Sequence, residues 1–469
     1  MLIYDFEQRG DLPLYEYLYQ CIRDDILSGR IRPDAKLPSK RELAADNHVS
    51  VRTVMNAYDQ LLTEGYITSE EKRGYFAARI DTGRQTPSAP ADTMPQPDPV
   101  YREESWFADF TSNTAIYEMF PFSLWRKTMR RVLSELDIEL VQRAHFLGVP
   151  LLRETIADYL YRSRGMRVSP EHIVIGPCIE FLYGKLIMLL QENSMYGAEN
   201  PGYKKIPRIY RDFGLNWHSI GMDEDGIRMR DIEKCHANVV HVSPEHHYPL
   251  GTVMSIGRRQ ELLDWAAAKP DRYIIEDDYD CEFRYKTRSI AALQSMDLNH
   301  RVIYMNTFSK TLAPSIRISY MVLPEKLMTR YVETTNFYSN ATSVCEQYAL
   351  AYFIQEGYFE RHVSRLKKYY QEEGERLIRI IKQDPLMPSK HIIGGESGTH
   401  LLVPVDTPLT DVEIKWAAKN RGINLNCLSE FCSAVDPRYD NILVLNYCSL
   451  DEKTLRETVH RLGGIFVEW

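Results

Sequence analysis

Residues 80–104 constrain the fold of this chain more than any other stretch, because they separate two regions that must fold independently. The segment includes Thr86-Pro87-Ser88-Ala89-Pro90 and Met94-Pro95-Gln96-Pro97-Asp98-Pro99 and has few apolar side chains. It can build no core and is expected to act as a partly extended tether. The chain has 469 residues, more than one core usually serves. We therefore expect a small domain at 1–79, a linker at 80–104 and a large domain at 105–469.

The composition excludes several classes of protein. The chain is 44% hydrophobic and 26% charged, as in ordinary globular proteins, and no apolar run is long enough to predict a membrane span. The start, Met1–Glu7, lacks the pattern of a signal peptide, so a cytoplasmic location is expected. The eight cysteines have no C-x-x-C spacing and the histidines no metal-ligand spacing, so we expect reduced thiols and no metal. A net charge of -8 argues against indiscriminate coating of nucleic acid but allows a small reading head.

The first 80 residues predict three helices followed by a β-hairpin. Apolar residues recur at every fourth position over 14–26, which indicates an amphipathic helix ending at Ser28-Gly29. Ser39 and Glu42 have the spacing of a capping box at the start of a second helix. A third helix, capped by Ser50, is expected over 50–63. Two strands should follow, around a basic tip.

The third helix is expected to present a polar face. We expect Val51, Val54, Tyr58 and Leu61 to face the core and Arg52, Thr53, Asn56 and Gln60 to face outward. Two short helices joined by a tight turn, the second with such a face, form a helix-turn-helix that can enter a major groove. A small helical module for protein interaction is the alternative.

Beyond residue 105 the pattern changes to helices that alternate with short β-branched runs. The strand-like runs are 173–175, 239–242, 273–275 and 302–304. This alternation predicts an α/β domain with a mainly parallel sheet, whose ligand lies at the carboxyl ends of the strands.

The loops at these strand ends carry distinctive residues. Lys310, in the loop after the last run, can hold an aldehyde as a Schiff base, and Arg317 seven positions on can hold a phosphate. The acidic run 276–282 can supply an aspartate to a pyridine nitrogen. The turn 199–203 should bring a tyrosine to the mouth of the sheet, and the helix start near Cys178 suits a phosphate. These features outline a pyridoxal-phosphate site, whereas the alternatives are an ordinary surface loop and, for the acidic run, a calcium site.

The head closely resembles a known family of DNA-binding domains. Its helix-helix-hairpin order and the stretches "KLPSKRELA", "VSVRTVMNAYDQLLTEGYI" and "RGYF" are similar to the winged helix of GntR-type bacterial repressors. The resemblance implies that double-stranded operator DNA is contacted by Arg41, Ser50, Arg52, Thr53 and the wing around Arg73 and Gly74.

The large region resembles fold-type-I aminotransferases, and with the head the chain is similar to the MocR/GabR subfamily of GntR regulators. The stretches "GVPLLRETIADYLYRSRG", "IIEDDYDCEFRY" and "NTFSKTLAPSIRISYMV" carry the resemblance. It implies a multidomain protein with an α+β winged helix-turn-helix head and an α/β fold-type-I PLP-dependent aminotransferase-like domain. It also implies a homodimer.

The resemblance assigns roles at the cofactor site. It implies that Lys310 forms the Schiff base with pyridoxal 5'-phosphate, that Asp277 rather than Asp278 pairs with the pyridine nitrogen, and that Tyr279 contacts the ring hydroxyl. The remaining contacts are Tyr203 beside the ring and Arg317, Thr307, Ser309 and the amides near Cys178 at the phosphate. The chain departs from the family at Ser315 and Ser319, where glycines are usual, at Pro177-Cys178, and at His247, where glutamine is common. We expect the added side chains to alter cofactor binding without abolishing it.

These features together predict a transcriptional regulator that senses a small amino compound or a B6 vitamer. An amine that replaces Lys310 on the aldehyde would change contacts between subdomains and so the placement of two heads on DNA. Two heads predict two operator half-sites. An active aminotransferase with a tethered DNA-binding domain and an inactive dimerisation scaffold remain as alternatives. The effector stays open, because the late loop 424–429 offers no arginine for a carboxylate.

Overall fold

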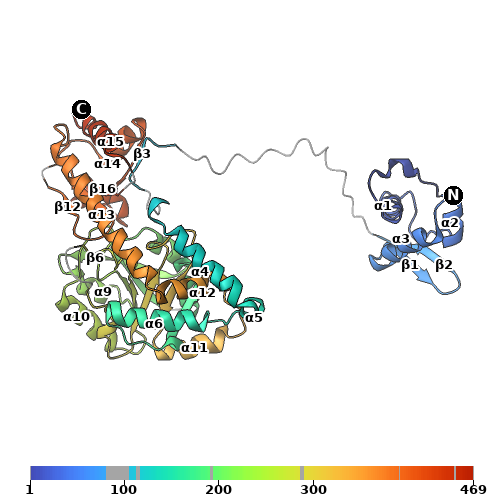
Figure 1. Cartoon of the computed structure of the whole chain (residues 1–469), viewed down its shortest axis with the longest axis horizontal. Helices are drawn as coiled ribbons and strands as arrows, with labels where there is room; N and C mark the ends of the chain where they lie inside the picture. Colours follow the sequence, from blue (N-terminus) through green and yellow to red (C-terminus); the bar gives the residue numbers. More distant parts are fainter. Residues whose placement is uncertain are drawn as a thin grey trace. The chain divides into compact units, whose positions relative to one another are not determined.

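The chain forms two compact units, Met1–Arg102 and Glu103–Trp469, drawn in Figure 1. The computed structural model describes residues 2–80, 105–111, 117–190, 194–285, 290–389, 391–447 and 450–467. All but the first residue of the predicted linker, 80–104, lies outside the described residues. Each unit has its own apolar core.

The amino-terminal unit, the head, consists of helices and a β-hairpin around one core. Its elements are η1 (Phe6–Arg9), α1 (Leu14–Leu27), α2 (Lys40–Asp46), α3 (Val51–Thr63), β1 (Ile67–Glu70) and β2 (Gly74–Ala77). Leu18 of α1 and Val54 and Leu61 of α3 are fully buried. The predicted element order is confirmed, but the expectation that Val51 faces the core is wrong, since it is 48% exposed. The buried stripe of α3 begins one turn later, so the first turn lies outside the core.

Side-chain caps start both helices of the helix-turn-helix. The Ser39 hydroxyl accepts a hydrogen bond from the Glu42 amide at 3.2 Å, and the Glu42 carboxylate accepts one from the Ser39 amide at 2.8 Å. The Ser50 hydroxyl accepts from the Thr53 amide at 3.1 Å. The Tyr58 hydroxyl of α3 donates to the carbonyl of Pro38 at 2.9 Å. These bonds fix α3 relative to the turn that precedes α2.

Replacing Ser39 with alanine is expected to lower the free energy of unfolding of the head by about 1 kcal/mol, because the Glu42 amide loses its cap. Hydrogen exchange of the α2 amides in the full-length protein measures the loss. Ser28→Ala is the control, since the Ser28 hydroxyl caps no helix start. Equal exchange rates in wild type and Ser39→Ala would contradict the role of the cap.

The carboxy-terminal unit is built on an eight-stranded sheet with the order β4-β11-β10-β9-β8-β5-β6-β7. Its strands are β4 (Ile173–Gly176), β5 (Met195–Asn200), β6 (Asn216–Asp223), β7 (Gly226–Ile227), β8 (Val239–Val242), β9 (Tyr273–Asp277), β10 (Val302–Thr307) and β11 (Ser319–Val322). The strands from β10 across to β6 pair in parallel, whereas β11 runs antiparallel to both β10 and β4. The four strand predictions and the mainly parallel sheet are confirmed.

Helices cover both faces of this sheet (Figure 1). Ile173 and Ile175 of β4 pack with α6 (Pro150–Arg164) and α12 (Val344–Gln355) on one face, while Val174 between them packs with α7 (Ile179–Leu189) on the other. This alternation follows from the two-residue period of a strand, and burial on both faces explains the near-continuous apolar runs. The helices are α4 (Phe122–Glu135), α5 (Asp137–Val141), α6 (Pro150–Arg164), α7 (Ile179–Leu189), α8 (Lys205–Asp212), α9 (Met229–Lys234), α10 (Ile256–Ala267), α11 (Glu325–Thr335) and α12 (Val344–Gln355).

A small subdomain completes the unit. The long helix α13 (Tyr358–Gln383) leads from the region of α12 into it (Figure 1). It contains a sheet with the order β12-β13-β16-β15 and two further helices. These elements are β12 (Ile393–Gly394), β13 (His400–Pro404), α14 (Asp411–Asn420), β15 (Asn426–Cys427), β16 (Ile442–Asn446) and α15 (Glu452–Ile465).

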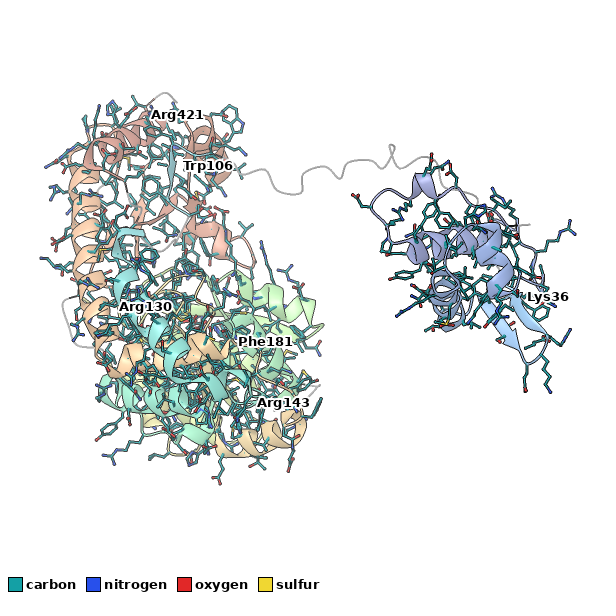
Figure 2. The ribbon with its side chains drawn as sticks, turned by 45° about the vertical axis from the view of Figure 1, so that its right-hand side comes forward. Lys36, Trp106, Arg130, Arg143, Phe181 and Arg421 are labelled. Atoms are coloured by element: carbon teal, nitrogen blue, oxygen red, sulfur yellow. The ribbon has the colours of Figure 1, made fainter. Side chains whose placement is uncertain are left out.

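The segment that follows the predicted linker is anchored in this small subdomain. Strand β3 (Ala108–Asp109) pairs in parallel with β14 (Ile423–Asn424), and the Asn446 amide donates to the carbonyl of Phe110 at 3.0 Å. Trp106 and Arg421 accordingly lie together at the end of the subdomain in Figure 2. The chain therefore enters the carboxy-terminal unit through the small subdomain.

The described residues contain neither a membrane-spanning helix nor a metal site. No described helix combines the length and apolar character that a bilayer crossing requires. No group of histidine, cysteine, aspartate and glutamate within the described ranges has the geometry to hold a metal ion.

Candidate functional site

A cavity of about 390 Å³ lies at the carboxyl ends of the parallel strands. Glu199 at the end of β5, Ser243 after β8, Asp277 at the end of β9 and Thr307 at the end of β10 contribute to its wall. This is the position at which open α/β sheets bind ligands. Every residue that the sequence assigns to the cofactor lines it: Cys178, Tyr203, Asp277, Tyr279, Thr307, Ser309, Lys310 and Arg317.

Lys310 presents a chemically reactive amine to this cavity. It lies in the loop between β10 and β11 and is partly buried. Burial lowers the pKa of its ammonium group, and the Asp280 carboxylate only partly opposes this shift. A lowered pKa raises the fraction of neutral amine, which is the nucleophilic form. Lys310 is therefore suited to attack a carbonyl.

Asp277 and Asp278 face opposite ways. The Asp277 carboxylate lines the cavity, with Oδ1 buried and without a hydrogen-bond partner and Oδ2 3.5 Å from His241 Nε2. Asp278 instead accepts a hydrogen bond from the Tyr304 hydroxyl at 2.6 Å and pairs with Arg164 Nη2 at 2.9 Å. A free buried carboxylate oxygen is costly unless a ligand satisfies it. Asp277 thus has the geometry to receive a protonated ring nitrogen, whereas the Asp278 carboxylate is already bonded to Tyr304 and Arg164.

Tyr279 is positioned by a buried histidine. Its hydroxyl lies 3.3 Å from His246 Nδ1, and the same nitrogen lies 2.7 Å from Asp280 Oδ2. Burial opposes charging of His246, but the Asp280 carboxylate outweighs it and the pKa of His246 is raised. This contact was not predicted from the sequence. The signal that could have found it was the His246-His247 pair together with the acidic run, which offers more carboxylates than a pyridine ring needs.

The side of the cavity that is predicted to hold a phosphate combines hydroxyl groups with Arg317. Thr307 Oγ1 accepts hydrogen bonds from the Ser309 amide at 3.2 Å and from the Ser319 hydroxyl at 2.9 Å. Ser319, one of the departures from the family, is therefore buried against Thr307 and does not line the cavity. Ser315, the other, is exposed and also outside the lining.

An aromatic cluster connects the cavity to the small subdomain. Tyr203 and Tyr248 both line the cavity, with ring centroids 6.3 Å apart. Tyr248 also packs edge-on against His400 at 4.9 Å and Phe431 at 5.4 Å, both from the small subdomain. The wall of the cavity is thus shared between the large sheet and the small subdomain.

Glu199 and His247 form a buried neutral pair that was not predicted from the sequence. Glu199 Oε2 accepts a hydrogen bond from the Ser243 amide at 3.1 Å and lies 3.6 Å from His247 Nε2, while Oε1 has no partner. Burial raises the pKa of Glu199 to about 8. Burial, with the nearby histidines, lowers the pKa of His247 to about 3. At neutral pH both side chains are therefore mainly uncharged.

Glu199→Gln is expected to stabilise the cofactor-free protein more at pH 8 than at pH 5. The folded pKa is raised from about 4.5 to about 8, so the unfolded chain loses this proton first and stability falls as pH rises through that window. The glutamine of the variant cannot ionise and keeps an acceptor for the Ser243 amide. We expect the difference in unfolding free energy between variant and wild type to grow by at least about 1 kcal/mol from pH 5 to pH 8.

Thermal unfolding of the full-length protein at the two pH values measures this difference. Glu261→Gln is the matched control, since Glu261 is exposed on α10 and paired with Arg258. A difference that stays constant with pH in Glu199→Gln would contradict the protonated state of Glu199.

The residues predicted to contact DNA lie on the head. Arg41 and Arg52 are exposed on α2 and α3. The hydroxyls of Ser50 and Thr53 bond to each other at 2.8 Å, so both are engaged in the start of α3. On the wing, Arg73 pairs with Glu70 and lies over the Phe76 ring, and Gly74 has a φ of 108°, a conformation that favours glycine.

Each of the two units matches the model of a known protein family. Residues 14–76 match the family model described as "Bacterial regulatory proteins, gntR family". Residues 111–462 match the model described as "Aminotransferase class I and II". The head and the sheet-based unit thus define a transcription regulator with an aminotransferase-like domain.

Several transcriptional regulators align with this chain over nearly their whole length, and so across both the head and the aminotransferase-like domain. The chain is 37% identical to the HTH-type transcriptional regulator YdeL of Bacillus subtilis over 96% of each chain. It is 30% identical to the probable rhizopine catabolism regulatory protein MocR of Rhizobium meliloti, over 100% of this chain and 96% of MocR. It is also 27% identical to the pyridoxine biosynthesis regulator PdxR of Corynebacterium glutamicum, over 94% and 93% of the two chains. The chain belongs to the MocR-type regulators of the GntR family.

Solved structures confirm the fold of the carboxy-terminal unit. The multiple substrate aminotransferase of Thermococcus profundus superposes with a TM-score of 0.69 at 22% identity, over 79% of this chain and 93% of the enzyme. The kynurenine aminotransferase of Pyrococcus horikoshii gives a TM-score of 0.66 at 23% identity, over 77% and 90%. The expected fold-type-I aminotransferase-like architecture is therefore present.

Proposed function

We propose that the carboxy-terminal unit binds pyridoxal 5'-phosphate in this cavity and serves as a ligand sensor that controls DNA binding by the head. The observation that carries the proposal is the presence of three complementary groups in one cavity. Lys310 offers an amine, Asp277 an unpartnered carboxylate oxygen, and Arg317 a guanidinium group. An aldehyde, a pyridine nitrogen and a phosphate require these three groups.

The lining residues fit the cofactor in further respects. When bound, the cofactor supplies an aldehyde that condenses reversibly with amines. Asp277 would hold the proton on the ring nitrogen, and Tyr279, held by His246, would reach the ring hydroxyl. Tyr203 would flank the ring, while Thr307, Ser309 and the amides near Cys178 would assist Arg317 at the phosphate.

A physical route leads from the cavity to the segment that precedes the small subdomain. Thr111 and Asn446 both line the cavity, and Asn446 Nδ2 donates to the Thr111 carbonyl at 3.0 Å. Thr111 also accepts a hydrogen bond on its hydroxyl from Asn424 Nδ2 at 3.0 Å. It follows β3 closely and lies seven residues after the end of the predicted linker at residue 104. A ligand that shifts these contacts would act directly on the chain that leads to the head.

We further propose that the protein acts as a homodimer on two operator half-sites. Several apolar side chains on and near α4 and α5 are exposed, among them Leu133, Ile138 and Val141, which are 58%, 67% and 84% exposed. A patch of this kind is typical of protein interfaces. Domain boundaries at 79 and 104 would leave each head tethered but independently oriented.

The effector that fits best is an amino compound or a B6 vitamer. Both would act at Lys310, the former by exchange on the aldehyde and the latter by occupying the cavity. The relative PdxR is named for pyridoxine biosynthesis, which supports the vitamer. Because Lys310 and Asp277 are also the groups that an aminotransferase uses, turnover of an amino donor with a keto acid would instead favour an active enzyme with a tethered head.

Lys310→Ala is expected to abolish the visible absorbance band of the protein with pyridoxal phosphate and to remove the effect of the effector on DNA binding. The amine that bonds the aldehyde is lost, while the other contacts stay. Absorbance spectra and operator binding measured in one sample test this. Lys269→Ala, at an exposed lysine outside the cavity, is the control. A wild-type protein without the band would leave only an inactive scaffold.

Arg52→Ala is expected to weaken binding to the DNA upstream of the protein's own gene by about tenfold, because α3 loses an exposed cationic contact. The cofactor spectrum should stay unchanged. Fluorescence anisotropy at two salt concentrations measures the affinity. Arg23→Ala, at an arginine paired with Asp24 on α1, is the control. Unaltered affinity in Arg52→Ala would show that α3 is not the recognition helix.

A further inference from the structure

A carboxylate of the protein lies at the phosphate side of the cavity. Glu180 is the second residue of α7 and lines the cavity together with Lys205 and Arg317. Its Oε1 lies 2.9 Å from Lys205 Nζ, and its Oε2 lies 3.9 Å from Arg317 Nη2. Glu180 therefore bridges two of the cations that line the cavity.

The Glu180 side chain is ionised in this position. Its partial burial favours the protonated form, but the hydrogen bond and charge of Lys205 together with hydrogen bonds from the start of α7 outweigh burial and lower the pKa of Glu180. The same bond raises the pKa of Lys205. The cavity thus contains a formed ion pair whose anion also faces the arginine that is best placed for a phosphate.

An incoming phosphate meets opposing interactions here. Arg317, the hydroxyls of Thr307 and Ser309 and the start of α7 favour an anion. Glu180 opposes it, because two anions that share one guanidinium group repel each other at short distance. Moving Glu180 away would break its charge-assisted hydrogen bond with Lys205. The protein therefore supplies its own competitor for the anion subsite.

We propose that Glu180 competes with the cofactor phosphate for Arg317 and so keeps phosphorylated B6 vitamers in reversible exchange with the protein. This inference rests on the proposed function, since it concerns the ligand of the same cavity. Glu180 acts on the phosphate alone, so it lowers the preference of the cavity for phosphorylated over unphosphorylated vitamers. Occupancy then follows the concentration of the free phosphorylated vitamer.

Glu180→Gln tests the competition with little change in shape. In cofactor-free full-length protein, we expect the variant to bind pyridoxal phosphate about fivefold more tightly, since the pair is partly exposed and screened. The affinity for pyridoxal, which lacks the phosphate, should stay within about twofold of wild type. Absorbance titrations measure both affinities. Glu261→Gln, which removes an exposed ion-paired glutamate outside the lining, should change neither.

A double-mutant cycle with Arg317→Gln locates the effect. If Glu180 acts through Arg317, the gain from Glu180→Gln should shrink to less than about twofold in the Arg317→Gln background. An equal gain in both backgrounds, equal tightening of pyridoxal, or unchanged affinity for pyridoxal phosphate would each overturn the proposal. Thermal unfolding of each variant checks that the fold is retained.

Inorganic phosphate separates this inference from the proposed function. Protection of the cofactor-free protein against thermal unfolding by phosphate should be stronger in Glu180→Gln than in wild type. If pyridoxal phosphate gives no visible band in any variant, the sensor function fails, yet stronger protection by phosphate would still support Glu180 as the competing anion. Equal protection in both proteins would count against Glu180 even where the band forms.

Discussion

The buried ion pair between Arg164 and Asp278 is the interaction on which the site depends. Arg164, at the end of α6, reaches Asp278 at 2.9 Å and also pairs with Glu245. Removing one partner of such a pair typically costs about 3–5 kcal/mol, because the other charge is left buried and alone. This pair holds the end of β9, and the neighbouring Asp277 is thereby left with a free oxygen in the cavity. Two consecutive aspartates at this strand end thus differ, since Asp278 is bonded within the protein and Asp277 has an unpartnered oxygen.

The cavity wall is shared between the large sheet and the small subdomain, and the proposed regulation depends on this division. The chain enters the carboxy-terminal unit through the smaller of these two parts. Strand β3 is anchored on β14, and Thr111 just beyond it reaches the cavity wall. Tyr248 adds a second contact by packing on Phe431. A ligand in the cavity would therefore contact Thr111, which belongs to the segment that follows the predicted linker.

Much of this architecture could be predicted from the sequence, because the signals were local. The capping box of Ser39 and Glu42 lies within one turn of helix, and the strand ends carry their functional residues within short loops. Val51 was placed wrongly because periodicity gives the direction of a side chain but not where the core ends. The pairs Glu180–Lys205 and Glu199–His247 could not be found in this way, since their members are far apart in sequence and meet only through the order of strands in the sheet.

The contacts of Ser319 and Glu180 were also not predictable from the sequence, because they depend on how distant segments meet in the fold. Ser319 stands where the family usually has glycine, and β11 directs its hydroxyl onto Thr307, to which it donates a hydrogen bond. Glu180 was not singled out from the sequence, and it lies beside Arg317 at the proposed phosphate subsite. A catalyst gains from cofactor that never leaves, whereas a sensor whose site is always filled reports nothing about concentration. A carboxylate that weakens its own cofactor subsite is therefore a liability for an enzyme and an advantage for a regulator.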